Sequence, residues 1–149
     1  MDNQQSINLR HIYLADDDPD DRQMFSEALS IVNSATKLFT SEDGLQLMDA
    51  LYVPPFPLPD IIFLDINMPK QTGLECLSAI RRHNHLQNLV IVMLTTSNSY
   101  LDMETAFTAG ASGYCVKCNS FEGLKKMIAK VLDIDWRVYE VSKSNFMLS

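Results

Sequence analysis

Acidic residues follow two separate apolar segments of this 149-residue chain. Asp16 and Asp17 come directly after the run His11–Ala15, and Asp65 comes directly after Asp60–Leu64. Carboxylates that crowd one crevice must raise one another's pKa values or share a cation. An all-oxygen ligand set without His or Cys favours a hard ion such as Mg²⁺, which keeps several of its waters. The three carboxylates therefore predict a Mg²⁺ site if the fold brings them together.

A hydroxyl and an amine follow two further apolar runs. Thr95 follows Leu89–Leu94, and Lys117 follows Gly113–Val116. Both groups are suited to binding the equatorial oxygens of a transferring phosphoryl group. Together with a metal ion and a nucleophilic carboxylate, they predict a site at which an aspartate forms an acyl phosphate. Taken singly, each of these residues is more commonly a helix cap, a turn former or a solvated side chain. The prediction therefore depends on their combination.

The apolar runs themselves are typical of strands that are covered on both faces, because they are short and bounded by polar residues. A weaker run, Thr36–Thr40, lies between the first two. Apolar residues at helical spacing separate the runs. Asp18 and Pro19 begin the first such helix, as N-cap and first helical residue, and Ser120 can cap the last. Gly110 is placed to end the fourth in a left-handed conformation. The apolar positions of the five helices are Met24, Phe25, Ala28, Leu29 and Val32; Leu45, Met48 and Leu51; Leu74, Leu77 and Ile80; Met103, Ala106 and Phe107; and Leu124, Met127, Ile128, Val131 and Leu132.

Fivefold alternation of strand and helix predicts an α/β domain with a doubly wound, five-stranded parallel sheet and helices on both faces. In the flavodoxin-like strand order 2-1-3-4-5, the crevice where the order reverses lies between the first and third strands. These are the strands followed by the three carboxylates. Ligands of open parallel sheets bind in this crevice, at the carboxyl ends of the strands.

Two stretches fall outside this pattern. Tyr52–Pro59 carries four prolines, which predicts an extended loop before the third strand. Asp135–Val141 could continue the last helix or form an arm, and its Trp136 and Tyr139 could close the core or project as a dimer arm. We therefore divide the chain into an N-terminal tail (1–10), a domain (11–132) and a C-terminal extension (133–149).

The composition excludes several classes of function. The net charge is −7 and no Lys/Arg run offsets it, which argues against nucleic-acid binding. The longest apolar runs are too short to span a bilayer, and residues 1–10 lack the apolar core of a secretory signal. Three cysteines fit a reducing compartment better than a disulfide framework. We expect a soluble, cytoplasmic, single-domain protein that binds neither nucleic acid nor membrane.

Four segments carry a resemblance to a known family: IYLADDDPDD, IIFLDINMP, VIVMLTTS and GASGYCVK. From about Ile12 to Leu132, the chain resembles the receiver domain of two-component response regulators, and in particular the single-domain, chemotaxis-regulator-like kind. The resemblance implies that a sensor histidine kinase or a histidine phosphotransfer protein donates a phosphoryl group to this chain. It also implies the roles of the site residues: Asp65 as phosphoacceptor, Asp16 and Asp17 as the acidic Mg²⁺ pair, the backbone carbonyl of Asn67 as a further ligand, Thr95 as switch hydroxyl, Tyr114 as aromatic switch, Lys117 as phosphate-binding lysine, and Met68, Pro69 and Gly73 as the turn after the phosphoacceptor.

On this reading the chain is a phosphoacceptor switch with self-catalysed phosphotransfer and dephosphorylation, not a turnover enzyme. Phosphorylation would draw in Thr95 and repack Tyr114, which would alter the face built from the fourth helix, fifth strand and fifth helix. The extension is too short for a DNA-binding output domain, so the signal would pass to an unidentified downstream protein, with a homodimer also possible. The chain departs from the family at Cys118, where a proline is usual, and in the long loop Tyr52–Pro59.

Three alternatives remain open at this point. The first is a degenerate receiver that binds partners without phosphorylation. The second is a small Mg²⁺-dependent phosphatase of the haloacid-dehalogenase type, for which Asp16 and Asp18 fit the pattern but Asp20 does not. The third is a redox or metal role for Cys115 and Cys118, which form a C-x-x-C. The histidines, His11, His83 and His85, have no partner pattern.

Overall fold

The computed structural model describes residues 9, 11–53 and 57–149 and forms five strands and five helices in strict alternation within these residues. Along the chain these are β1 (His11–Ala15), α1 (Pro19–Val32), β2 (Lys37–Ser41), α2 (Gly44–Tyr52), β3 (Ile61–Leu64), α3 (Gly73–Arg82), β4 (Val90–Thr95), α4 (Tyr100–Thr108), β5 (Gly113–Val116) and α5 (Phe121–Asp133). The strands form one sheet in the order β2-β1-β3-β4-β5, and every pairing is parallel. This confirms the doubly wound α/β fold.

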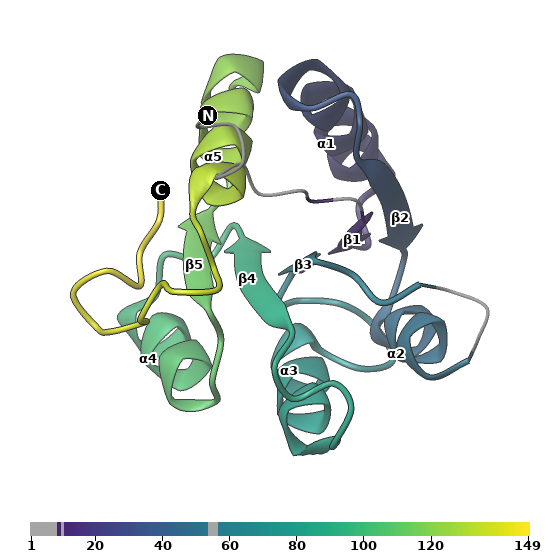
Figure 1. The fold of residues 1–149 in the computed structure, drawn as a ribbon, viewed down its shortest axis with the longest axis vertical. Helices are drawn as coiled ribbons and strands as arrows, with labels where there is room; N and C mark the ends of the chain where they lie inside the picture. The colour runs from purple at the N-terminus through teal and green to yellow at the C-terminus, as the bar shows by residue number, and fades with distance from the viewer. Residues whose placement is uncertain (1–8, 10, 54–56) are drawn as a thin grey trace.

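The sheet is the middle of three layers. Figure 1 shows α1 and α5 together on one side of it, and α2, α3 and α4 on the other. Successive residues of β1 point to opposite sides: Ile12 and Leu14 pack in the core under α1 and α5, whereas Tyr13 and Ala15 pack in the core under the other three helices. Burial on both faces explains why the strand sequences are continuous apolar runs.

Element boundaries lie within one residue of those predicted for the strands. β2 and β4 lie one residue later along the chain, which makes Thr95 the last residue of β4 rather than the residue after it. The predicted loop at Tyr52–Pro59 begins one residue too early, because Tyr52 still belongs to α2; residues 54–56 lie outside the described part.

The predicted caps are present. The Asp18 carboxylate accepts N–H groups of the first turn of α1, and Gly110 has a φ of +99° after α4.

The C-terminal extension folds back on the domain. Residues 135–139 form turns and do not continue α5, and the Trp136 indole donates to the Val131 carbonyl at 3.1 Å while its ring packs on the core under α1 and α5. The final segment then runs beside β5, in yellow in Figure 1. The Tyr114 N–H donates to the Phe146 carbonyl at 3.0 Å, and the Leu148 N–H donates to the Tyr114 carbonyl at 2.9 Å. The last residues thus cover the outer edge of the sheet.

Shortening Leu148 is expected to destabilise the whole domain although it lies one residue from the C-terminus. Its side chain is 3% exposed and fills the space over Gly113, where a Cβ would lie 2.4 Å from the Leu148 Cδ1. Leu148→Ala should cost about 2 kcal/mol of unfolding free energy, measured by urea denaturation. The matched control is Met147→Ala, because Met147 is 40% exposed, and its cost should be about 0.5 kcal/mol or less. Equal costs for the two variants would show that the segment is not docked.

Candidate phosphoacceptor site

The three carboxylates gather at the carboxyl ends of β1 and β3, which are neighbours in the sheet. The backbone fixes this arrangement, since the Asp65 N–H donates to the Ala15 carbonyl and the Asp16 N–H donates to the Ser41 carbonyl, both at 3.0 Å. One carboxylate oxygen of each of Asp16, Asp17 and Asp65 lies within 4.8 Å of the others. Asp16 and Asp65 are buried, whereas Asp17 is exposed. The group is therefore partly closed and reachable from solvent on the Asp17 side.

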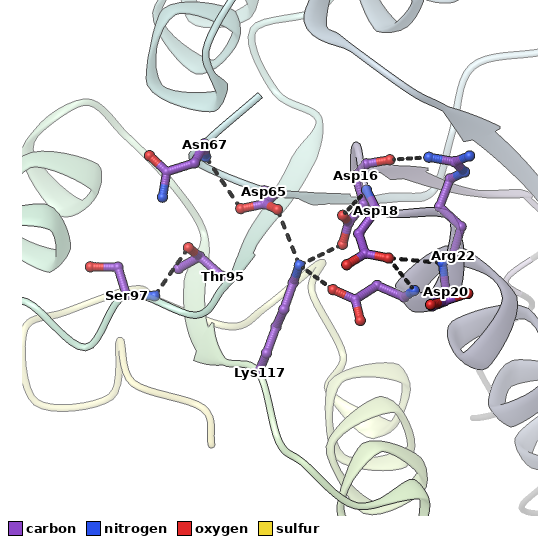
Figure 2. Close-up of polar contacts among 10 residues, drawn as sticks. Asp16, Asp18, Asp20, Arg22, Asp65, Asn67, Thr95, Ser97 and Lys117 are labelled. Atoms are coloured by element: carbon purple, nitrogen blue, oxygen red, sulfur yellow. Dashed lines mark hydrogen bonds and ion pairs between the residues drawn. The ribbon is translucent and has the colours of Figure 1, made fainter. Parts of the chain in front are cut away.

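Asp16 is held at both its carboxylate and its backbone. Its Oδ1 accepts the Asp18 N–H at 3.0 Å, and its backbone carbonyl accepts from the Arg22 guanidinium at 2.7 Å (Figure 2). Both donors come from the turn and the helix that follow β1. The other carboxylate oxygen, Oδ2, faces Lys117 at 2.7 Å. The oxygen that faces the crevice is consequently Oδ2.

Asp65 is arranged in the same way. Its Oδ1 accepts the Asn67 N–H at 3.2 Å, and its Oδ2 faces the Lys117 ammonium at 3.1 Å (Figure 2). The Gly73 N–H closes the turn by donating to the Ile66 carbonyl at 2.8 Å. The structure gives Asn67 a role in orienting Asp65, and the ligand role of its carbonyl stays a prediction.

Lys117 lies at the centre of the site. Its Nζ contacts Asp16 at 2.7 Å, Asp21 at 2.8 Å and Asp65 at 3.1 Å. The lysine reaches these partners although Cys118 follows it in place of the usual proline. Asp21 was not among the site residues predicted from the sequence. The one signal that could have singled it out is its position in the first turn of α1, shortly after Asp16 and Asp17.

Burial and the neighbouring charged groups have opposite effects on the pKa values of Asp16 and Lys117. Burial raises the pKa of Asp16, and hydrogen bonds from Lys117 and from the Asp18 N–H offset this only in part. For Lys117, burial lowers the pKa, but hydrogen bonds to Asp16 and Asp21, with the charges of Asp65 and Asp16, outweigh it and leave the pKa raised. The ammonium therefore stays charged at neutral pH, and among the described residues it is the one cation in contact with these buried carboxylates.

The donor set fits a hard divalent cation. It consists of carboxylate oxygens with no nitrogen or sulfur ligand, which is the choice of Mg²⁺ and similar ions. Two oxygens bound to one Mg²⁺ lie at most about 4.2 Å apart, because each lies about 2.1 Å from the ion. The oxygens of Asp16, Asp17 and Asp65 lie within 4.8 Å of one another, so small side-chain movements would bring them onto one ion.

Thr95 and Tyr114, the two predicted switch residues, share the neighbour Ser97. The Thr95 hydroxyl is buried and accepts the Ser97 N–H at 3.2 Å, and the Tyr114 hydroxyl donates to the Ser97 carbonyl at 2.8 Å. The Ser97 hydroxyl in turn bonds Asp102, in the first turn of α4, at 2.6 Å. Figure 2 shows Thr95 directed to Ser97. Ser97 joins the two predicted switch residues to α4, a connection for which the sequence held no signal beyond its place after Thr95.

The three cysteines are free in the structure. Burial raises the pKa of the Cys115 thiol to about 12, which keeps it protonated and unreactive at neutral pH. Cys118 is exposed, and its Sγ lies 3.5 Å from the Ser120 hydroxyl. The arrangement gives no support to the redox reading of this C-x-x-C.

A five-stranded doubly wound domain with an acidic crevice at its switch point belongs to the class of α/β proteins that bind their ligand at strand carboxyl ends. The family model for the response regulator receiver domain matches residues 12–129, and the chain belongs to this family. Response regulators receive phosphoryl groups from histidine kinases. Within the described residues, no helix combines the length and apolar character needed to cross a membrane.

The most similar relatives include two small regulators. The chain is 30% identical to the response regulator Rcp1 of Synechocystis over 121 residues, covering 78% of this chain and 82% of Rcp1. It is 31% identical to the chemotaxis protein CheY of Pseudomonas aeruginosa over 98 residues, covering 66% and 77%. Among solved structures, the phosphorylated cyanobacterial phytochrome response regulator RcpA matches with a TM-score of 0.79 at 25% identity, over 90% of this chain and 98% of RcpA. The Mn²⁺-bound form of Rcp1 matches with a TM-score of 0.77 at 26% identity, over 89% and 99%.

Proposed function

We propose that this protein is a receiver that accepts a phosphoryl group on Asp65 and passes the signal to a protein partner by changing conformation. The observation that supports this most is the position of the Asp65 Oδ2, 3.1 Å from the Lys117 ammonium and beside the carboxylates of Asp16 and Asp17. Asp65 can act as the nucleophile, and the Lys117 ammonium and a cation bound by the carboxylates would stabilise the negative charge of the incoming phosphoryl group. Two solved relatives, one phosphorylated and one holding Mn²⁺, support the proposal that this chain takes up a phosphoryl group and binds a divalent cation.

The chemistry is a direct transfer. An oxygen of Asp65 attacks the phosphorus of a phosphohistidine, the P–N bond breaks, and the imidazole leaves with its electron pair, so that an acyl phosphate forms. Bound Mg²⁺ would supply positive charge to the transferring oxygens and would be held by Asp16, Asp17 and Asp65. Lys117 would bind a second phosphoryl oxygen, and the Thr95 hydroxyl a third. Water attack on the phosphorus later releases phosphate and restores Asp65, so the chain acts as a timed switch and not as a turnover enzyme.

The conformational change that follows phosphorylation would begin at Ser97. Movement of the Thr95 hydroxyl toward a phosphoryl oxygen breaks its bond with the Ser97 N–H, and Ser97 also holds the Tyr114 hydroxyl and Asp102 of α4. Phosphorylation would therefore alter the face formed by α4, β5 and α5, the surface for the downstream partner or for a second copy. Partner, dimerisation and cytoplasmic location remain predictions from the sequence.

The test of the proposed function is intact mass spectrometry after incubation with acetyl phosphate, with and without Mg²⁺. We expect wild-type protein to gain the mass of one phosphoryl group only when Mg²⁺ is present. Beryllofluoride binding serves as the second measurement, because it detects a competent site even if the acyl phosphate is short-lived. Failure of both would identify a degenerate receiver that acts by binding alone.

A further inference from the structure

Asp21 is a third carboxylate partner of Lys117 and has no part in the proposed transfer. It lies in the first turn of α1, and its Oδ2 is 2.8 Å from the Lys117 Nζ, between the contacts with Asp16 at 2.7 Å and with Asp65 at 3.1 Å. The two residues are 96 positions apart in the sequence. The Asp21 side chain is 34% exposed and that of Lys117 is 15% exposed, so the pair is partly shielded from solvent. Asp21 does not belong to the group of carboxylates that could hold a metal ion.

The other two partners of Lys117 are needed elsewhere when the site works. In both Asp16 and Asp65, Oδ1 accepts a backbone N–H, from Asp18 and from Asn67 respectively. The oxygens without a backbone donor are the Oδ2 atoms, and these are the atoms that Lys117 contacts. A cation and a phosphoryl group that use these oxygens would compete with the lysine for them. Their entry would draw Asp16 and Asp65 away from the ammonium and leave Asp21 as its partner.

We propose that Asp21 is a positioning residue that keeps the Lys117 ammonium at the crevice while Asp16 and Asp65 turn to the metal and the phosphoryl group. A lysine has four rotatable side-chain bonds, and without a fixed partner its head group would spread over many rotamers in solvent. Asp21 restricts this spread, since it is held on a helix whose first turn is capped by Asp18. The inference rests on the proposed function and adds a residue that acts through Lys117 without touching the phosphoryl group.

The proposal separates two measurable quantities. Asp21→Asn should lower the rate constant for labelling by acetyl phosphate at saturating Mg²⁺ by about tenfold, because a charge-assisted hydrogen bond to the lysine is lost. The Mg²⁺ concentration that gives half the maximal rate should change by about twofold or less, since Asp21 is not a ligand. Asp21→Glu keeps the charge on a side chain one CH₂ longer, which can still reach the lysine, and should recover most of the rate. A residue that only stabilised the fold would not lower the labelling rate while leaving the half-saturating Mg²⁺ concentration nearly unchanged.

The matched control is Asp20→Asn. Asp20 is the preceding residue in the same helical turn, carries the same charge, is exposed and makes no ion pair with Lys117 among the described contacts. Its substitution should leave the labelling rate within about twofold of wild type. Equal rates for Asp21→Asn and Asp20→Asn, or an Asp21→Asn defect that added Mg²⁺ removes completely, would overturn the inference for Asp21. Absence of labelling in wild type is a different result, because it would overturn the proposed function as well.

Discussion

Replacing Asp65 with asparagine is expected to abolish labelling by acetyl phosphate completely, at any Mg²⁺ concentration. The amide oxygen is a poor nucleophile and carries no negative charge, so no acyl phosphate can form at this position. The fold should be retained, because the substitution keeps the shape of the side chain and removes one negative charge from a group that includes buried Asp16. Lys117 also contacts Asp16 and Asp21, and these contacts should persist in the variant. Intact mass and thermal unfolding measured side by side would separate loss of chemistry from loss of structure.

The control for this variant is Asp49→Asn, which removes the same charge from an exposed position of α2. It should take up one phosphoryl group at the wild-type rate. Persistent labelling of Asp65→Asn would place the nucleophile elsewhere, and fragmentation of the labelled protein would then show which of the remaining carboxylates carries the group.

The second large effect concerns Gly73, the first residue of α3. A Cβ at this position would lie 1.9 Å from the Asp65 carbonyl oxygen and 2.9 Å from the Ile66 Cα. Both are backbone atoms, so the contact cannot be relieved by a side-chain rotation. Gly73→Ala should therefore destabilise the fold by about 3 kcal/mol and displace the turn that presents Asp65, with loss of labelling. The sign of this change in stability is informative, because alanine is otherwise favoured over glycine within a helix by about 1 kcal/mol.

Urea denaturation of Gly73→Ala beside Ser78→Ala would test this expectation. Ser78 is half-buried on the same helix, and its substitution should change the unfolding free energy by about 0.5 kcal/mol or less. If the Gly73→Ala protein were as stable as wild type and fully labelled, the backbone of the turn after Asp65 would have to move easily enough to accept a Cβ at position 73.

Much of the fold followed from patterns that act over a few residues. The run DIIFL predicted a strand buried on both faces, and β3 is such a strand, beginning one residue later at Ile61. Asp18 and Gly110 predicted the start of α1 and the end of α4, because capping depends on the backbone of the same turn. The α/β class followed in turn from the alternation of strands and helices. The one-residue errors lie at strand ends: Thr36, Asp60 and Leu89 precede the strands to which they were assigned, and β2 and β4 extend to Ser41 and Thr95.

The position of the C-terminal extension and the roles of Ser97 and Asp21 depended on contacts between residues far apart in the sequence. The ring of Phe146 packs on Tyr114 and Phe107, with centroids 6.1 Å and 5.2 Å apart, so the extension completes the sheet edge instead of continuing α5. Ser97 and Asp21 gained their contacts in the same way, from residues 17 and 96 positions away.

The sequence by itself determined the elements, their caps and the set of candidate residues for binding a cation and a phosphoryl group, because each of these depends on residue type and near neighbours. Only the tertiary structure decided which acids of the segment DDDPDD face the lysine. Asp16 and Asp21 contact it, whereas Asp18 caps the helix. All five carry the same group, and their difference in role comes from the direction in which β1 and α1 present them to Lys117, a residue that the chain brings to the crevice only when β5 pairs with β4.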